Sequence, residues 1–301
     1  MYERVLAELQ GHAWVLRQDK LEAMVTMFAH RASGLQVPGA VSAEAVAQAK
    51  QRSQPRRAMS VAVLPVFGVL ANRANLLSDI SGGSSIEQLS AAYDKLVADD
   101  TVGAIVLDIE SPGGSAAGTM EWADKIYQAR GIKPTIAVAN AESASGSYWI
   151  GSAANEFVIV PSGEVGSVGA FAVHLDKSGA NEAMGFKYTY ISYGEHKTEG
   201  NPDSPLSDTA LEHIQEHINT IGQRFEKAVA KYRGVNVATV RKTFGQGQMF
   251  MAEQALERKM VDRIDTLENT IARLAGTKKQ GKGVRVAHAK RRLETGLNST
   301  T

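Results

Sequence analysis

Residues 135–154, TIAVANAESASGSYWIGSAA, constrain the fold of this chain most strongly. They open with an apolar, β-branched run typical of a buried strand, pass through small residues, and continue as a helix that begins at Ser145 and Gly146. A serine at such a corner is lifted out of the sheet beside the first N–H groups of the helix. The pattern is not G-x-S-x-G, which disfavours an α/β-hydrolase with a Ser-His-Asp triad. Ser145 is therefore a candidate nucleophile, although a helix N-cap is the common role for serine here.

Apolar runs typical of strands alternate with helical segments through most of the chain. This alternation favours βαβ crossovers and an α/β fold with a mostly parallel sheet that is covered on both faces. We expect strands at 61–70, 102–109, 135–139, 157–160 and 188–192.

The helices between these strands carry start and stop signals. Ser84 and Glu87 have the spacing of a capping box, and a long helix is expected from Asp208 to a glycine stop at Gly234. Shorter helices are expected near Asn181 and over 252–259. The apolar positions expected to face the core are Ile86, Leu89, Tyr93 and Leu96, then Met120, Ala123, Ile126 and Tyr127, then Leu211, Ile214, Ile218, Ile221, Phe225 and Val229.

Three segments differ in character along the chain. Residues 1–57 combine helical periodicity with a polar, basic linker, so we expect a helical N-terminal extension there. Residues 58–272 hold the alternating strands and helices of the main domain. Residues 273–301 are basic and lack apolar periodicity, which predicts a disordered tail. No signal sequence or membrane span is recognisable, so a cytoplasmic protein is expected.

Composition removes several classes of function. The 33 basic and 32 acidic side chains leave a net charge of +1, so no global field draws the protein to nucleic acid. Only weak, non-specific contact through the basic tail is expected. The absence of cysteine excludes disulfides, thiolate nucleophiles and cysteine-bound metal. We expect no cofactor and no metal ion.

Glycine-rich turns follow three of the predicted strands and would meet at the carboxyl edge of one sheet. In the turn from Ser111 to Gly114, the missing Cβ atoms would let backbone N–H groups approach an oxygen with developing negative charge, as in an oxyanion hole. The Gly146 N–H, beside Ser145, would be a second donor. The same SPGG sequence fits a simple turn and helix start equally well.

The order of these motifs resembles that of one protein family. A strand followed by SPGG, then ASGSYWI, then GSVG at 166–169, then GEHKTEGNP at 194–202 is similar to the signal peptide peptidase A family of serine proteases, and within it to the prohead proteases of tailed phages. The similarity covers about residues 60–270. It implies a ClpP/crotonase-like fold and a serine nucleophile with a lysine base.

The resemblance assigns roles to individual residues. The nucleophile falls on Ser145, the base on Lys197, and Ser167 matches a serine that hydrogen-bonds the lysine. A free lysine has a pKa of about 10.4 and must be desolvated to act as a base, which substrate or oligomer contacts could achieve. On its own, the polar loop around Lys197 is typical of a solvated charged run.

The resemblance also assigns the oxyanion donors. Gly114 and Gly146 fall where the donors are expected, with Gly113 next to them. One departure is Ser147, which replaces the second glycine of the family's usual S-G-G-Y.

Two other active-site hypotheses fit parts of the sequence. His213 and His217 spell H-x-x-E-H, an inverted zincin motif, but they lie within an amphipathic helix where partly exposed histidines are ordinary. A crotonase-type acyl-CoA enzyme would share the fold and a backbone oxyanion hole, but would not require the combination of Ser145, Ser167 and Lys197.

These observations favour a Ser-Lys endopeptidase that cleaves extended polypeptides lying as an added strand. The phage branch implies scaffold and other prohead proteins as substrates, possible self-cleavage, and action inside the assembling prohead in the host cytoplasm. The family also implies a homo-oligomer in which a neighbour could complete each site. The alternatives are a bacterial cytoplasmic signal-peptide peptidase-like protease and a non-catalytic capsid-assembly factor.

Overall fold

The computed structural model describes residues 13–32, 54–73 and 83–276. The predictions for the first twelve residues, for most of the linker and for residues 277–301 of the basic tail lie outside these ranges. The predicted start of the disordered tail at residue 273 is wrong, because residues 273–276 continue the helix Leu267–Gly276. No helix within the described ranges is long and apolar enough to cross a membrane.

The main sheet is built around three long parallel strands: β3 (Val61–Phe67), β6 (Ala104–Ser111) and β8 (Thr135–Ala144). Strand β8 pairs with two different strands along its length: its first half pairs in parallel with β9, and its last residues pair in parallel with β10. The sheet is completed by β9 (Glu156–Ile159), β10 (Glu164–Gly166), β2 (Arg56–Ala58), β11 (Met249–Met251) and β12 (Arg263–Ile264). The expected mostly parallel α/β fold is confirmed.

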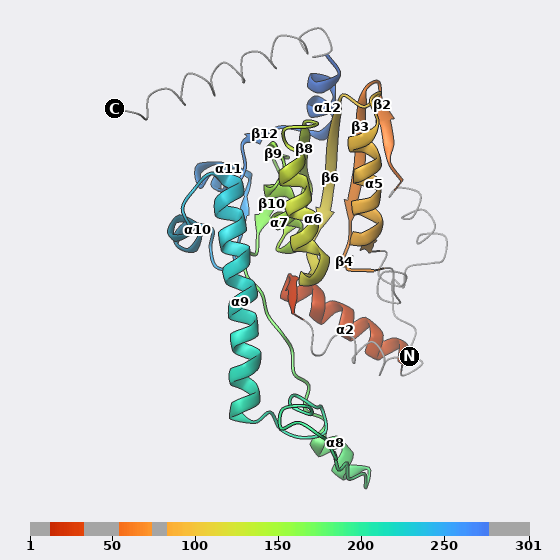
Figure 1. The fold of residues 1–301 in the computed structure, drawn as a ribbon, viewed down its shortest axis with the longest axis vertical. Helices are drawn as coiled ribbons and strands as arrows, with labels where there is room; N and C mark the ends of the chain where they lie inside the picture. The colour runs from red at the N-terminus through yellow and green to blue at the C-terminus, as the bar shows by residue number, and fades with distance from the viewer. Residues whose placement is uncertain (1–12, 33–53, 74–82, 277–301) are drawn as a thin grey trace.

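Helices cover both faces of this sheet, as Figure 1 shows. The larger core lies beneath α5 (Ile86–Ala98), α6 (Ala116–Ala129), α7 (Gly146–Ser152) and part of α9 (Asp208–Arg233). A smaller core on the opposite face packs β3, β6, β8 and β9 against α12 (Leu267–Gly276). The remaining short helices of this body are α10 (Val237–Thr243) and α11 (Ala252–Glu257).

A second, four-stranded sheet lies at one end of the body. Its order is β1 (Trp14–Leu16), β7 (Gly113–Ser115), β4 (Leu70–Ala71) and β5 (Ser84–Ser85). Strand β1 runs antiparallel to β7 and leads directly into α2 (Gln18–Ala32). This small sheet therefore brings an N-terminal segment against the glycines of the SPGG turn.

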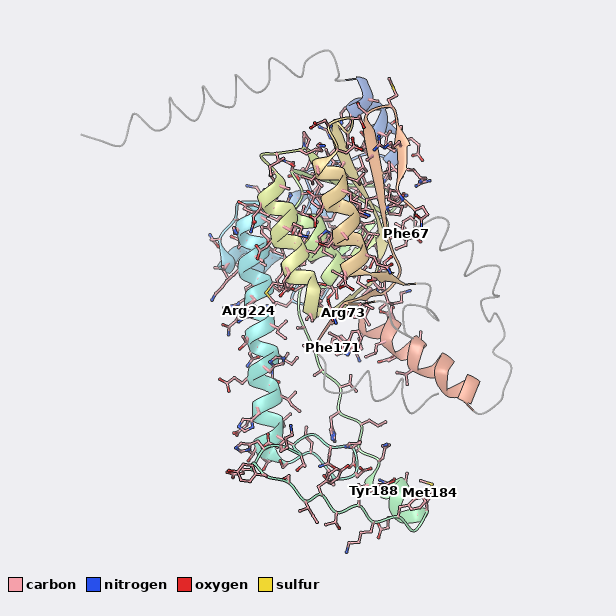
Figure 2. The ribbon with its side chains drawn as sticks, turned by 45° about the vertical axis from the view of Figure 1, so that its right-hand side comes forward. Phe67, Arg73, Phe171, Met184, Tyr188 and Arg224 are labelled. Carbon is pink, nitrogen blue, oxygen red and sulfur yellow. The ribbon has the colours of Figure 1, made fainter. Side chains whose placement is uncertain are left out.

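Residues 172–214 form an arm that leaves the body, carries α8 (Ser178–Ala183), and returns along α9 (Figure 1). Met184 and Tyr188 lie at its far end (Figure 2). The arm carries large apolar side chains that are exposed: Val173, Leu175, Met184, Phe186, Tyr188, Tyr190, Ile191, Tyr193 and Leu211.

Several sequence-based predictions are confirmed in this fold. The apolar face of α5 is buried as expected, and α9 runs from Asp208 to a left-handed Gly234 cap. Only the last part of the predicted α9 stripe is buried, however, because its first turns belong to the arm. Strand β8 continues to Ala144, five residues beyond the expected end at Ala139.

Four other predictions of local structure are wrong. Residues 188–192 form no strand, because no described strand offers them a hydrogen-bonding partner. Gly113 and Gly114 lie in β7 rather than at a helix start. The α5 cap is Ser85, whose Oγ accepts from Gln88, whereas Ser84 Oγ donates to the Phe67 carbonyl. Trp14–Leu16, expected as helix, is strand β1, since β7 supplies a partner edge.

Helix α7 is fixed by packing and by hydrogen bonds at its end. Trp149 stacks on Phe225 of α9, with ring centroids 4.4 Å apart and planes inclined by 7°. The Arg130 guanidinium donates to the carbonyls of Ser152 and Ala153, at 3.0 and 2.8 Å, and so satisfies groups at the end of α7. The position of Ser145 therefore depends on α6 and α9 as well as on the sheet.

Phe225→Ala should lower the free energy of unfolding by about 3–5 kcal/mol, because it removes a fully buried ring and leaves a cavity beside Trp149. Leu211→Ala is the matched control on the same helix, where the side chain is 52% exposed, and should change stability by less than about 1 kcal/mol. Equilibrium denaturation followed by circular dichroism measures both. Equal effects of the two substitutions would contradict the assignment of this contact.

Candidate active site

Ser145 occupies a strained corner between β8 and α7. Its backbone dihedrals are φ 54° and ψ −116°, which a non-glycine residue adopts only when the surroundings enforce it. Its N–H donates to the Gly166 carbonyl at 2.8 Å, and its carbonyl accepts from Trp149 at 2.9 Å. The corner is therefore held from both the neighbouring strand β10 and the helix that follows.

The side chain of Ser145 is not used as a helix cap. It makes no capping hydrogen bond to α7, although the residue sits at the N-cap position and is 1% exposed. Ser147, by contrast, donates its Oγ to the carbonyls of Ser111 (2.7 Å) and Ala144 (2.9 Å), and Ser143 lies within 3.4 Å of it. The two neighbouring serines thus contribute to the core, and Ser147 ties α7 to the end of β6.

The glycines of β7 and α7 allow close backbone approach around this corner. A Cβ on Gly114 would lie 1.9 Å from the Leu70 carbonyl oxygen, so only glycine lets β4 pack this tightly. A Cβ on Gly113, whose φ is +95°, would lie 2.9 Å from the Gly146 nitrogen. Gly113 and Gly146 therefore lie close together beside Ser145, whereas Gly114, the next residue of β7, packs against β4. The Gly113 N–H already donates to Ser111 Oγ at 3.2 Å.

The GSVG segment lies on the other side of Ser145. Gly166 accepts the Ser145 N–H, and the next residue, Ser167, has φ 54° and donates its N–H to the Gln248 carbonyl at 2.8 Å. The Ser167 side chain is half-buried. The structure therefore brings Ser167 into the neighbourhood of Ser145, as the resemblance implies.

Lys197 is not brought to this site within one chain. It lies on the exposed turn between α8 and α9, in the arm, whereas Ser145 lies in the body (Figure 1). The desolvation that a lysine base requires is thus not supplied by its own surroundings in the arm. The five other predicted site residues gather around one corner, and the lysine stands apart from them.

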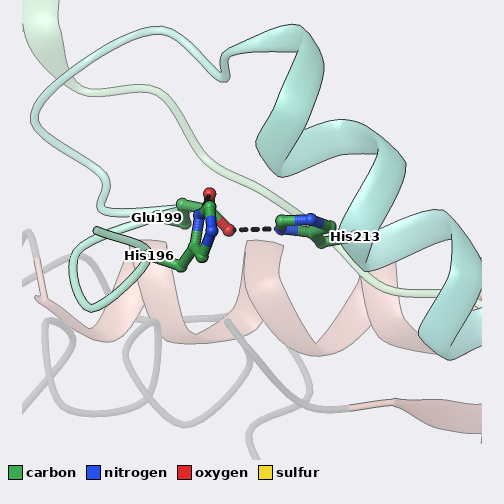
Figure 3. Close-up of side chains that lie close together, drawn as sticks. All are labelled: His196, Glu199 and His213. Atoms are coloured by element: carbon green, nitrogen blue, oxygen red, sulfur yellow. Dashed lines mark hydrogen bonds and ion pairs between the residues drawn. The ribbon is translucent and has the colours of Figure 1, made fainter. Parts of the chain in front are cut away.

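The turn that carries Lys197 is attached to α9 by a hydrogen-bonded cluster, shown in Figure 3. Glu199 accepts from His196 Nδ1 at 2.5 Å and from His213 Nδ1 at 2.8 Å. The two imidazole rings meet edge to face, with centroids 4.9 Å apart. The cluster raises the pKa of His213 through the Glu199 carboxylate, and the hydrogen bonds from His213 and His196 lower the pKa of Glu199.

Among the described residues, these three side chains form the group that could hold a metal ion, with ligand atoms within 4.8 Å of one another. His217 is not part of the group, so the two histidines of the H-x-x-E-H motif, for which the sequence favoured ordinary exposed positions on a helix, do not share this cluster. His213 turns instead toward a carboxylate from the preceding loop. Sequence periodicity could not show this, because Glu199 and His213 meet only through the fold of the arm.

The mostly parallel α/β fold, with a serine at a strained corner between a strand and a helix, is consistent with the ClpP-like fold that the sequence predicts. Comparison with known families agrees, since the model described as Peptidase family S49 matches residues 128–281. The chain belongs to peptidase family S49.

Individual relatives include phage proteins and signal peptide peptidases. The chain is 32% identical over 216 residues to the capsid assembly protease C of Escherichia phage lambda, covering 70% of this chain and 49% of that protein. It is 30% identical over 215 residues to the head-tail preconnector protein GP5 of Enterobacteria phage P21, covering 71% and 42%. A putative signal peptide peptidase SppA of Enterococcus faecium is 27% identical, covering 72% and 63%. The chain thus spans about half the length of the phage relatives.

The cluster at Glu199 predicts a measurable pH dependence. The pKa of His213 is higher in the folded protein than in the unfolded chain. The stabilisation from its pairing with Glu199 is therefore complete below the unfolded histidine pKa of about 6.5, and it is lost as the pH rises through the pKa of His213 in the folded protein. Glu199→Gln should lower the pKa of His213 toward its ordinary value, as followed by NMR titration of the imidazole. Glu195→Gln, a change in the same turn outside the cluster, is the control. A His213 pKa unchanged by Glu199→Gln would contradict the pairing.

Proposed function

We propose that this protein is an endopeptidase in which Ser145 is the nucleophile and Lys197 the general base. Lys197 Nζ takes the Ser145 proton as Oγ bonds to the substrate carbonyl carbon. The peptide bond then breaks, the leaving amine takes the proton, and water hydrolyses the acyl-enzyme. The observation that carries the proposal is the strained backbone of Ser145, whose side chain makes no capping hydrogen bond. The neighbouring Ser147, by contrast, donates its hydroxyl to the buried Ser111 carbonyl.

The proposed oxyanion donors are the backbone N–H groups of Gly114 and Gly146. Gly146 directly follows the proposed nucleophile, and Gly114 follows Gly113, whose added Cβ would lie 2.9 Å from the Gly146 nitrogen. Gly113 is the weaker candidate because its N–H already donates to Ser111 Oγ. Removing one such donor typically slows acylation by a factor of about 100–1,000.

The proposed base reaches Ser145 from a neighbouring copy of the chain. Two observations support this: Lys197 is exposed on the arm, and the same arm carries most of the exposed large apolar side chains among the described residues. Packing of that apolar surface against a second copy would bury it and supply the desolvation that a lysine base needs. Ser167 would then orient the incoming lysine.

The proposed substrates are polypeptides of an assembling phage head. Support comes from the names of the two phage relatives, a capsid assembly protease and a head-tail preconnector protein. Scaffold and other prohead proteins, and the chain itself, are the natural candidates, with action inside the prohead of the host cell. A signal-peptide peptidase role is the second candidate, favoured by the SppA relative. The non-catalytic assembly-factor hypothesis predicts no cleavage at all.

Ser145→Ala and Lys197→Ala should each abolish cleavage of scaffold and capsid proteins when these are coexpressed with the protease, while Ser147→Ala should retain it. The reason is that Ser147 donates to backbone carbonyls and its loss costs stability, about 1–3 kcal/mol, rather than chemistry. Intact-mass spectrometry of the products measures the outcome. Truncated products from Ser145→Ala would refute the assignment of the nucleophile, and intact products from the wild type would favour the assembly factor.

The source of the lysine can be tested by complementation. Coexpression of Ser145→Ala with Lys197→Ala should restore part of the activity that each lacks alone, since a mixed oligomer holds sites with Ser145 from one copy and Lys197 from the other. A double variant, Ser145→Ala with Lys197→Ala, mixed with either single variant is the control and should stay inactive. Absence of rescue in verified mixed oligomers would show that each chain uses its own lysine.

A further inference from the structure

Strand β1 lies between two backbone edges beside the candidate nucleophile. On one edge it pairs antiparallel with β7, so that Trp14, Val15 and Leu16 stand opposite Ser115, Gly114 and Gly113. On the other edge, Trp14 and Phe171 exchange two hydrogen bonds, at 2.9 and 3.0 Å. Phe171 lies where the chain leaves the body for the arm (Figure 2). The segment is therefore held in an extended conformation, with strand β7 on one edge and the backbone of Phe171 on the other.

Within this segment Val15 lies against the glycines that flank Ser145. A Cβ on Gly113 would be 2.2 Å from the Val15 carbonyl oxygen, and a Cβ on Gly146 would be 3.1 Å from the same oxygen. The Val15 side chain is fully buried, and its Cγ2 would lie 2.9 Å from a Cβ added at Gly146. The Val15 carbonyl lies close to Gly146, and Val15 stands opposite Gly114 in the ladder. Val15 is therefore next to both proposed oxyanion donors, where the carbonyl of a bond to be cleaved would have to lie.

We propose that the space between β7 and Phe171 binds the backbone of the substrate, and that β1 is an internal peptide that occupies this space. The bond between Val15 and Leu16 would then lie where the bond to be cleaved lies in a substrate. This inference rests on the proposed function. Substrates would bind as extended chains through strand hydrogen bonds, with a small, β-branched apolar residue at the position of Val15. Strand β1 must leave before another polypeptide can enter.

The end of β1 is held by charge rather than by packing alone. Arg17 donates to Asp19 and to Glu142 of β8, at 2.9 and 2.6 Å, and lies 3.7 Å from Glu164 of β10. These carboxylates surround the point where the chain leaves this space for α2. Replacing Arg17 by Glu adds a fourth carboxylate at this point, so the repulsion should weaken the attachment of β1, whose residues are buried against the body.

The first test compares Arg17→Glu with the wild type and with Arg57→Glu. The second substitution removes an ion pair between Arg57 of β2 and Asp99 at the end of α5. The probe is a fluorescein-labelled peptide with the sequence of residues 11–20, GHAWVLRQDK, and binding is followed by fluorescence anisotropy. We expect at least tenfold tighter binding to Arg17→Glu than to the wild type or Arg57→Glu. Equal binding to all three folded chains would overturn the proposal. A peptide with aspartate in place of Val15 is the probe control.

The second test locks β1 in place. The chain has no cysteine, so Trp14→Cys with Ser115→Cys, opposite one another in the ladder, introduces one possible disulfide. In the oxidised state, labelling of Ser145 by a fluorophosphonate and binding of the peptide should both be lost, and reduction should restore them. Each single-cysteine variant controls for the lost side chain. Failure of the pair to close, or full peptide binding in the locked state, would overturn the proposal.

The two proposals fail in distinguishable ways. Peptide binding requires no chemistry, so redox-dependent binding with no labelling or cleavage in any state would refute the Ser145 assignment and leave peptide binding between β7 and Phe171 standing. Cleavage that is unaffected by the lock would leave the peptidase standing and refute the role of β1.

Discussion

The hydrogen bond from the Ser145 N–H to the Gly166 carbonyl holds the strained corner on which the rest of the site depends. A positive φ at a non-glycine residue persists only where neighbouring structure over-determines it. Here the determinants come from far apart in the chain: β10 supplies the carbonyl, α9 supplies Phe225 under Trp149, and Arg130 closes the end of α7. The serine is consequently fixed before any substrate arrives, and the ordering cost is met by folding rather than by binding.

Near this corner, the four-stranded sheet lies close to the main sheet because glycines allow the backbones to approach. Gly114 lets β4 approach β7, while Gly113 and Gly146 leave room for the carbonyl of Val15. A site that accepts backbone on both edges is selective for extended chains, because strand pairing reads the main chain and leaves side-chain choice to a few positions. The absence of Cβ atoms at Gly113 and Gly146 permits β1 to lie there, and it would equally permit the close approach of an oxyanion in the proposed mechanism.

The groups proposed for the chemistry differ in how they are held. Ser145, Gly146 and Ser167 belong to the packed body, whereas Lys197 lies on the exposed arm and is tethered through Glu199 and His213. Tyr193 and Ile191 beside it are almost completely exposed. Large apolar side chains left in water favour association, and burial of the arm would change the environment of the lysine at the same time. Assembly and catalytic competence would then be one event.

The sequence by itself determined the parallel α/β core, the buried face of α5, the bounds of α9 and the corner at Ser145, because these follow from local periodicity, caps and small residues. It could not determine that Trp14–Leu16 would be a strand or that 188–192 would not. A strand exists only when another edge pairs with it, and those edges lie about a hundred residues away for β1. Only the tertiary structure decided which residues surround Ser145, that Val15 lies among them, and that Lys197 does not, since each depends on long-range pairing that no local pattern encodes.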